Sequence, residues 1–467
     1  MNQFVNVAVQ MPDSVTENGA ATFSSSLDTN VDLFFRVGAS RGKAAEVVRL
    51  FKNALAENQD LAVRIALWGR DARGGAGERE IFREMLKVMP PEVQLALIPK
   101  IVELGRWDDL GVLVESNYGN VVVKAAFHWH DAIMNGNGLA AKWCPRKGPL
   151  AVMLRTLWVM SPKQYRKTIV SATKVVEQQM CAKQWNEINF AHVPSVAAAR
   201  YNSAFSRNAT EVYLAYKNSL IKGETKINAS AVFPHDVIRA AKGNSDHDVI
   251  DAQWKALPDY LNGKASDILV MSDVSGSMGC AVSGSVTAMD ISIALGLYVS
   301  ERQSGAFKDL VLTFSSDPQF HKVHGHNIVE RIRNLASADW GTSTNIGKAF
   351  QCILSVAKQN RVSQDEMPKI LLILSDMEFD ACDRGMTNFQ NLKNMYVESG
   401  YELPKLVFWN LNSRTKNVPV RYNEQGVALV SGFSPSIMKS ILSAEEFSPK
   451  QIMLDTVMVD RYSVKLG

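Results

Sequence analysis

The stretch ILVMSDVSGSMG, residues 268–279, joins a run of apolar residues to a loop of acid, hydroxyl and glycine residues. The apolar run is typical of a strand that is buried on both faces of a sheet. Asp273, Ser275 and Ser277 follow the run at alternate positions. Three oxygen side chains at one strand end can hold a cation, activate a nucleophile or cap the next helix, and the rest of the chain has to discriminate among these uses.

Residues 263–467 alternate between apolar runs and helical stretches. The apolar runs cover residues 267–272, 309–315, 369–375 and 405–410. The helical stretches between them cover residues 287–302, 345–359 and 387–399. Continuous apolar strands that alternate with helices predict a mainly parallel, doubly wound sheet with helices on both faces.

Residues 31–262 have a helical pattern almost throughout. Apolar residues recur at three- and four-residue spacing in the stretches 43–57, 60–71, 77–89 and 90–105. Short loops between successive helices favour antiparallel pairs stacked as a HEAT-like α-solenoid. The expected fold class is therefore α plus α/β, with a helical domain at 31–262, an α/β domain at 263–467 and a loose lead-in at 1–30.

Composition describes a soluble globular chain of two or three domains. Of the 467 residues, 46% are hydrophobic and 21% are charged, and no apolar run approaches the roughly 20 residues of a membrane span. The N-terminus lacks the basic start and apolar core of a signal peptide. The five cysteines are scattered without a C-x-x-C pair, which argues against a disulfide framework and favours the reducing cytoplasm.

Positive charge is concentrated in one block of the chain. Residues 141–242 hold 16 Lys or Arg against 5 Asp or Glu, whereas the net charge of the whole chain is only +4. A surface of this kind favours phosphate-bearing partners. A solvated surface without a partner is the alternative.

The segment 161–176 indicates how the basic block is presented. Ser161 can cap a helix whose first turn holds Pro162. At about 100° per residue its basic and apolar side chains fall on opposite faces. The basic residues that we expect to bind RNA are Lys142, Arg146, Lys147, Lys163, Arg166, Lys167, Lys174, Arg200, Arg207 and Lys217.

Two further loops can supply oxygen ligands to the end of the sheet that carries Asp273. The run at 369–375 is followed by Asp376, and WGTSTNIG offers Thr342 and Thr344 ahead of a helix. Ligands collect at the carboxyl ends of parallel strands, and hard oxygens with two carboxylates suit Mg²⁺ or Mn²⁺. Helix capping alone would explain one hydroxyl but not the whole set.

Known catalytic motifs do not fit this loop. A haloacid-dehalogenase phosphatase needs a second Asp where Ser275 stands, and neither a P-loop nor a G-x-S-x-G nucleophile elbow occurs. We therefore expect no catalytic residue. A metal-dependent hydrolase stays as a remote alternative.

The pattern D-x-S-x-S after a buried strand, a later Thr loop and a distal Asp resembles the metal-ion-dependent adhesion site of von Willebrand factor A domains. By this resemblance the metal ligands are Asp273, Ser275, Ser277, Thr342 and Asp376. The family's metal, Mg²⁺ or Mn²⁺, typically accepts an acidic side chain from a protein partner at its open position.

A helical domain followed by a domain with this metal-site pattern resembles the TROVE architecture of the Ro autoantigen. The sequence is most similar to a little-characterised TROVE-like family. The matching phrases are DLFFRVGASRG, RDARGGAGERE, LGRWDDL, VPSVAAARYNSAF, KINASAVFPHDVI, ILSDMEFD, VFWNLNSR and LVSGFSPSIMKSIL. The resemblance implies binding of small noncoding or single-stranded RNA, on helices that can close into a ring. The function it predicts is a non-catalytic, cytoplasmic RNA-binding protein with a Mg²⁺ adhesion site. The alternative is a metal-dependent protein-interaction module without a nucleic-acid role.

Two other groups of residues have open roles. The glycine-rich loop at 70–80 offers Arg70, Arg73 and Arg79 either for phosphate or for local ion pairs. The histidines of FHWHD (127–131) and HKVHGH (321–326) hint at metal ligands but are more simply structural or exposed.

Overall fold

The chain divides into two compact units. The computed structural model describes residues 11–225, 227, 229, 232–243, 247–263, 265, 267–314, 317–338, 345–381 and 386–465. The first unit comprises the described residues of 1–43, 233–247 and 257–459, and the second those of 44–232, 248–256 and 460–467.

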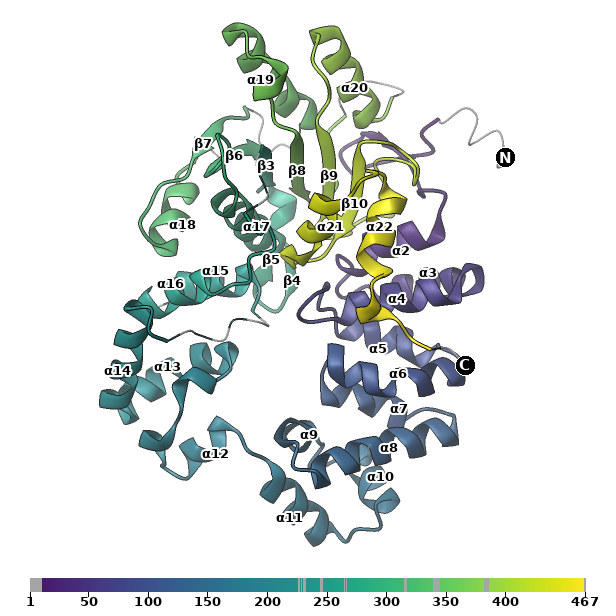
Figure 1. Ribbon diagram of the computed structural model, residues 1–467. Helices are drawn as coiled ribbons and strands as arrows, with labels where there is room; N and C mark the ends of the chain where they lie inside the picture. Colours follow the sequence, from purple (N-terminus) through teal and green to yellow (C-terminus); the bar gives the residue numbers. More distant parts are fainter. Residues whose placement is uncertain are drawn as a thin grey trace. The chain divides into compact units, whose positions relative to one another are not determined.

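The first unit is built on a six-stranded sheet (Figure 1). Its strands are β3 (Ile268–Asp273), β6 (Leu310–Phe314), β7 (Phe320–Lys322), β8 (Ile370–Ser375), β9 (Lys405–Asn410) and β10 (Val427–Ser431). They lie in the order β10-β9-β8-β3-β6-β7. All neighbours are parallel except β6 and β7, which are antiparallel. The prediction of a mainly parallel sheet is confirmed.

Helices bury this sheet. Helix α17 (Ala288–Arg302) packs on the central strands β3, β6 and β8, and every residue of β3 is buried. The other helices of the unit are α2 (Thr29–Val37), α15 (Pro234–Lys242), α18 (Ile328–Ala336), α19 (Ile346–Asn360), α20 (Asn388–Ser399), α21 (Met438–Ser443) and α22 (Pro449–Val457). Short strands β4 (Ala281–Ser283) and β5 (Val286–Thr287) pair with each other after the first loop.

The N-terminal segment belongs to the sheet unit, which differs from the predicted boundaries at residues 30 and 262. Residues 11–30 are not a loose lead-in, because β1 (Ser14–Val15) and β2 (Ala21–Thr22) form a hairpin. Helix α2 packs on β10. The Phe34 carbonyl accepts a hydrogen bond of 2.8 Å from the Ser431 hydroxyl. Such contacts join residues nearly 400 positions apart, so they cannot be predicted from a local sequence pattern.

The second unit is helical, as predicted (Figure 1). Its helices are α3 (Ala44–Glu57), α4 (Gln59–Arg70), α5 (Glu80–Lys87), α6 (Pro91–Leu104), α7 (Gly111–Val114), α8 (Gly119–Met134), α9 (Gly138–Trp143), α10 (Pro149–Leu157), α11 (Pro162–Ala172), α12 (Val176–Cys181), α13 (Ser195–Asn208), α14 (Thr210–Ile221) and most of α16 (His247–Lys255). Helices close in sequence pack together, for example α3 with α4 and α13 with α14. Phe190, Phe205 and Tyr213 form a small core at the second of these pairs.

The described residues agree with two general features of the sequence. Cys144, Cys181, Cys280 and Cys352 are free thiols, and Cys382 lies outside the described residues. Within the described part of the chain, no helix has both the length and the apolar character required to cross a bilayer.

Candidate cation site and basic surface

Asp273 ends β3 and is fully buried. Its Oδ1 accepts a hydrogen bond of 2.9 Å from the Ser275 backbone N–H, and its Oδ2 accepts one of 2.6 Å from the Ser375 hydroxyl. The hydroxyl oxygens of Ser275 and Ser277 lie 3.1 Å apart. The predicted loop therefore gathers one carboxylate and two hydroxyls at the carboxyl end of the strand.

Asp376 reaches the same place because β8 is the parallel neighbour of β3. Its Oδ1 accepts a hydrogen bond of 3.3 Å from the Glu378 backbone N–H, and the Ser277 side chain also hydrogen-bonds this carboxylate. Its Oδ2 is buried and has no hydrogen-bond partner among the described residues. The Arg414 guanidinium lies 4.0 Å from that oxygen.

The electrostatics of this pair are unfavourable without a cation. Burial, followed by the nearby charge of Asp376, raises the pKa of Asp273 to about 7. Burial also raises the pKa of Asp376, although the Ser277 hydroxyl, the Glu378 N–H and Arg414 act in the opposite direction. A divalent cation would neutralise both carboxylates and give the unpartnered oxygen a ligand role. The donor set, two carboxylates and two hydroxyls, fits Mg²⁺ or Mn²⁺.

The fifth predicted ligand, Thr342, lies outside the described residues, as does Thr344. Asn345, directly after them, caps α19 by accepting a hydrogen bond from the Lys348 N–H. Among the described residues, no group of three or more His, Cys, Asp or Glu side chains is placed to hold a metal ion. The candidate site therefore depends on hydroxyl ligands as well as carboxylates.

Three residues at this end of the sheet were not anticipated from the sequence. Glu378 is buried, and its carboxylate accepts hydrogen bonds from the Thr415 hydroxyl (2.5 Å) and from the Glu17 backbone N–H (2.7 Å). Arg414 forms an ion pair of 2.7 Å with the Glu17 carboxylate. The acids of SDMEFD, residues 375–380, were a readable signal for Glu378, whereas nothing local links Glu17 or Arg414 to the loop.

Helix α11 presents basic side chains as predicted. The Ser161 hydroxyl caps it by accepting a hydrogen bond from the Gln164 N–H, and Pro162 occupies its first turn. Tyr165 and Ile169 are buried on one face. The exposed side chains in and just after the helix include Lys163, Arg166, Lys167 and Lys174.

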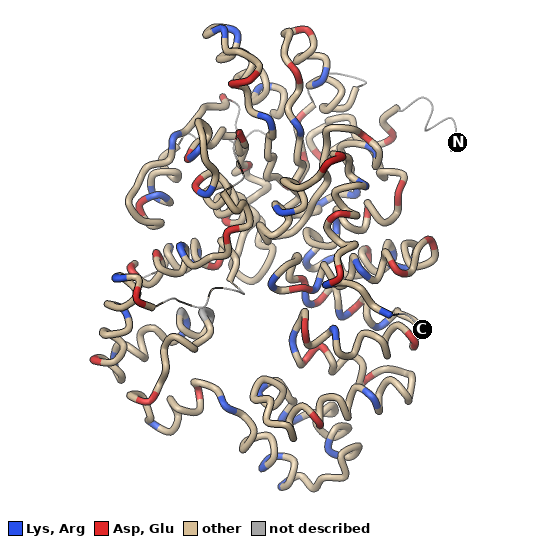
Figure 2. The backbone as a smooth tube through the Cα atoms, viewed as in Figure 1, with Lys and Arg blue, Asp and Glu red and all other residues tan. Residues whose placement is uncertain are grey.

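The remaining predicted RNA contacts comprise residues that contact neighbouring side chains and residues that are exposed. Lys142 forms an ion pair of 3.1 Å with Glu177. The Lys217 ammonium lies 5.6 Å from the Tyr213 ring centroid. Along the tube between α9 and α14, Lys and Arg outnumber Asp and Glu (Figure 2). The exposed members are Arg146, Lys147, Arg200 and Arg207.

The glycine-rich loop at 70–80 is mainly a structural junction. Arg70 is buried and forms a salt bridge of 2.6 Å with Asp109. Asp71 is also buried and accepts hydrogen bonds from the Arg461 guanidinium and the Tyr462 hydroxyl. Local pairing therefore accounts for Arg70, which is not available to phosphate, while Arg79 is exposed.

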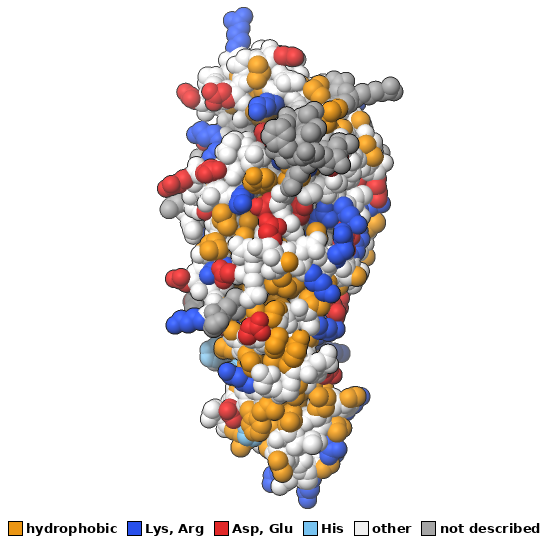
Figure 3. Space-filling view, turned by 90° about the vertical axis from the view of Figure 1, so that its right-hand side faces the viewer, with side chains coloured by type: hydrophobic (Ala, Val, Ile, Leu, Met, Phe, Trp, Pro, Cys, Tyr) orange, Lys and Arg blue, Asp and Glu red, His pale blue; other side chains and the backbone are white. Residues whose placement is uncertain are grey.

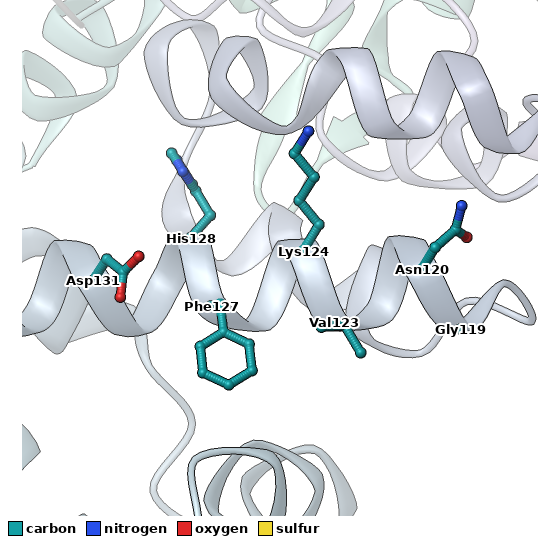
Figure 4. A pocket seen from close by; sticks show the side chains of 7 residues that line it. All are labelled: Gly119, Asn120, Val123, Lys124, Phe127, His128 and Asp131. Carbon is teal, nitrogen blue, oxygen red and sulfur yellow. The ribbon is translucent and has the colours of Figure 1, made fainter.

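An open hollow of about 720 Å³ lies along α8. Figure 4 shows Lys124 and His128 directed to one side of the helix and Phe127 to the other. His128 stacks on Trp107, and His130 lies against Trp158, so the two histidines do not converge on a metal. Hydrophobic side chains are also visible at the surface in the lower half of the side view (Figure 3), and Phe127 and Met134 of α8 are exposed.

The histidines of HKVHGH likewise have structural partners. The His321 ring forms a hydrogen bond of 3.1 Å with the Asn334 side chain. The backbone N–H of His324 donates to the same Asn334 side chain, and that of His326 donates to Glu330. These contacts tie the segment to α18.

Comparison with known proteins gives a relative over nearly the whole chain. The protein described as "Uncharacterized protein L728" of Acanthamoeba polyphaga mimivirus is 30% identical over 501 residues, covering 94% of this chain and 86% of the relative. The chain belongs to the family of this mimivirus protein. In the present chain, residues 153–266 match Domain of unknown function (DUF2828) and residues 267–464 match Domain of unknown function (DUF7788). Most of the exposed basic residues named above lie in the first of these regions, and the candidate cation site lies in the second.

The fold comparison is weaker. The crystal structure of the Deinococcus radiodurans RO (RSR) protein aligns over 96% of each chain with 12% identity and a TM-score of 0.35. A score this low carries no argument about the fold or the function of this family member.

Proposed function

We propose that the protein is a non-catalytic RNA-binding protein of the Ro/TROVE type. In this proposal the second unit binds small noncoding or single-stranded RNA on its basic surface. The first unit holds Mg²⁺ or Mn²⁺ and recruits an acidic protein partner. The sequence resemblance to TROVE proteins supports the proposal, as does the succession of packed helices in the second unit, which is compatible with a solenoid.

One observation carries the RNA part. Eight of the ten predicted contact residues are exposed, and among the described residues none of the eight forms an ion pair with Asp or Glu. They are Arg146, Lys147, Lys163, Arg166, Lys167, Lys174, Arg200 and Arg207. Cations that lack local counter-charges attract a polyanion and release its counterions on binding. We define these eight residues as the basic surface.

The cation part rests on Asp273, Ser275, Ser277 and Asp376, which would hold the ion. When bound, the ion supplies a charge that can attract a carboxylate of a partner. The chain's own residues hold the ligands in place, since Ser375 orients Asp273 and the Glu378 N–H orients Asp376. No nucleophile or general base accompanies them in this proposal, so the protein acts by binding.

The RNA part is tested by titrating the purified chain with mixed small RNAs at several salt concentrations. Replacing Lys163, Arg166, Lys167 and Lys174 by Gln should weaken binding of many RNA sequences alike. If all four contact phosphate in single-stranded RNA, the slope of log K against log salt should become shallower by about 3. Binding that is absent at low salt, or insensitive to salt, contradicts the proposal.

A matched control removes the same number of positive charges elsewhere. Arg49, Lys52, Lys308 and Lys358 are exposed and lie outside the basic surface. Their replacement by Gln should change RNA affinity less than twofold, roughly the scale of surface substitutions without a specific role. Equal loss in both quadruple variants would indicate a response to total charge only.

The second candidate is a metal-dependent protein-interaction module without a nucleic-acid role, which the unpartnered Oδ2 of Asp376 favours. Affinity purification from the host, with and without chelator and with and without nuclease, discriminates the two. Partners that chelator removes and nuclease leaves favour the interaction module. Co-purified RNA that depends on the basic surface favours the leading proposal.

A further inference from the structure

The N-terminal hairpin covers the loop that carries Asp376. The tip of the hairpin, residues 16–19, contacts the chain directly after β8 through three hydrogen bonds. The Thr16 hydroxyl donates to the Phe379 carbonyl (2.7 Å), the Glu17 N–H donates to the Glu378 carboxylate (2.7 Å), and the Asn18 side chain donates to the Glu378 carbonyl (2.6 Å). The hairpin therefore positions the Glu17 side chain beside the candidate cation site.

Glu17 and Arg414 form a charge pair next to Asp376. One guanidinium nitrogen of Arg414 lies 2.7 Å from a Glu17 carboxylate oxygen, and the other lies 4.0 Å from Oδ2 of Asp376. The Glu17 charge raises the pKa of Asp376 and the Arg414 charge lowers it, so both charges are close enough to act on this carboxylate. The Asp376 oxygen that faces Arg414 has no hydrogen-bond partner among the described residues.

We propose that Arg414 is a resident counter-cation of the cation site and that Glu17 limits how strongly Arg414 competes with the divalent ion. The proposal rests on the cation site of the proposed function. At 4.0 Å the guanidinium stabilises the charge of Asp376 without a direct hydrogen bond, which leaves the oxygen open to an ion. Pairing with Glu17 neutralises part of the guanidinium charge. The N-terminal hairpin is thereby an element that sets the affinity for the metal.

Opposite signs for the two single variants follow from this arrangement. Arg414→Gln removes a positive charge beside the ligand and leaves Glu17 unpaired, so the affinity for Mn²⁺ should rise roughly three- to tenfold. Glu17→Gln frees the full charge of Arg414, so the affinity should fall by a similar factor. The double variant should lie within about twofold of the unaltered chain, because a neutral pair has been removed.

The experiment is a titration of the full chain with Mn²⁺, followed by the paramagnetic signal of the free ion. Arg421→Gln is the matched control. The Arg421 guanidinium also ties the N-terminal segment to the same region, through the Ser25 carbonyl and the Phe23 ring, but Asp376 is not among the charges that act on it. Its replacement should leave Mn²⁺ affinity unchanged.

The outcomes distinguish failure of this inference from failure of the cation site itself. Single variants that both lower the affinity, or that both leave it unchanged, overturn the roles of Glu17 and Arg414 while the cation site stands. No Mn²⁺ binding by the unaltered chain, or equal binding by Asp273→Asn, overturns the cation site and this inference with it. Glu17 is 43% exposed, so Glu17→Gln should fold, and the sign of its effect is a test even if Arg414→Gln unfolds.

Discussion

At the scale of single residues, Asp273 is held in an unfavourable state that a cation relieves. Its carboxylate is fully buried and lies near Asp376. Burial and the charge of Asp376 together raise the pKa of Asp273 to about 7. Asp273→Asn should raise the thermal midpoint of the chelated protein by about 2–4 °C for each kcal/mol of relieved repulsion. It should also abolish the stabilisation by Mg²⁺, which for the unaltered chain is about 2.7 kcal/mol at 100 times Kd. Differential scanning calorimetry with and without Mg²⁺ measures both, and a variant that still responds to Mg²⁺ contradicts the assignment.

His235, in the first turn of α15, makes stability depend on pH. Burial lowers its pKa to about 4, with Asp236 and Asp290 opposing this effect and Arg41 and Arg239 adding to it. The unfolded chain takes up a proton near pH 6.5 while the folded chain does not, so stability present above pH 6.5 is lost as the pH falls towards 4.

The loss attributable to His235 should be about 2 kcal/mol between pH 7 and pH 5. His235→Phe suits the neighbouring rings of Phe233 and Phe433 and removes the titrating group. Unfolding by urea at the two pH values should show a smaller loss for the variant than for the unaltered chain. Equal losses would mean that His235 does not control this part of the pH profile.

Gly38 lies where the N-terminal segment touches the sheet. A Cβ atom at this position would lie 2.7 Å from both the Cα and the N of Gly432, which are backbone atoms and cannot swing away. Gly38→Ala should therefore reduce the free energy of unfolding by about 1–3 kcal/mol. Gly119→Ala, where a Cβ meets nothing within 4 Å, is the control and should be neutral or slightly stabilising in thermal unfolding.

At the scale of elements, the central strands could be predicted from the sequence because they are buried on both faces. Strands β3, β6, β8 and β9 begin and end within one residue of the predicted runs. A strand in the middle of a parallel sheet needs apolar residues on both sides, so its sequence is a continuous apolar run. The helices α17, α19 and α20 likewise begin and end within one residue of the predicted helical stretches.

Other elements carry weaker signals. Strand β10 holds the apolar run VALVS, residues 427–431, which was readable but was not assigned as a strand. Strand β7 and the N-terminal hairpin are short and largely polar. Their positions depend on partners far away in the sequence, such as the Phe379 carbonyl that Thr16 contacts. Local pattern contains no information about such partners.

Thr16 is the residue that fixes the hairpin to the sheet unit. Its hydroxyl donates to the Phe379 carbonyl and accepts from the Ala20 N–H, and all of these groups are buried. Thr16→Val keeps the shape of the side chain and leaves two backbone groups unsatisfied, at about 1–3 kcal/mol. Amide exchange at Ala20 should accelerate by roughly five- to 150-fold if exchange there follows local opening of the hairpin.

The control for this prediction is Ser24→Ala. The Ser24 hydroxyl also makes a hydrogen bond, to Asp13, but that pair is exposed to solvent. Its removal should alter amide exchange at Ala20 by less than about threefold, since exposed polar pairs contribute little. If both variants behaved alike, the hairpin would not depend on its buried contacts.

At the scale of the whole molecule, the sequence predicted which side chains meet but not what surrounds them. Asp273 and Asp376 were expected together because both follow strands whose carboxyl ends share one edge of the sheet. The arrangement around them, with an unpartnered Asp376 oxygen and the Glu17–Arg414 pair, depends on the packing of the N-terminal hairpin. Packing of distant segments is a three-dimensional property that residue spacing does not encode.

Charge is also divided at this scale, since the basic surface lies in the second unit and the candidate cation site in the first. Sites without shared partners contribute independently to binding. Asp273→Asn should therefore leave RNA affinity within about twofold of that of the unaltered chain. The quadruple Gln variant at Lys163, Arg166, Lys167 and Lys174 should likewise leave Mn²⁺ affinity unchanged.

A combined variant with all five substitutions tests this independence directly. Its RNA affinity should match that of the quadruple variant, and its Mn²⁺ binding should match that of Asp273→Asn, in titrations at one fixed salt concentration. An additional loss of RNA binding in the combined variant, or an RNA affinity that chelator lowers in the unaltered chain, would mean that the ion and the RNA are thermodynamically coupled. Coupling of that kind must be reciprocal, so saturating RNA would then have to raise the affinity for Mn²⁺ by the same factor.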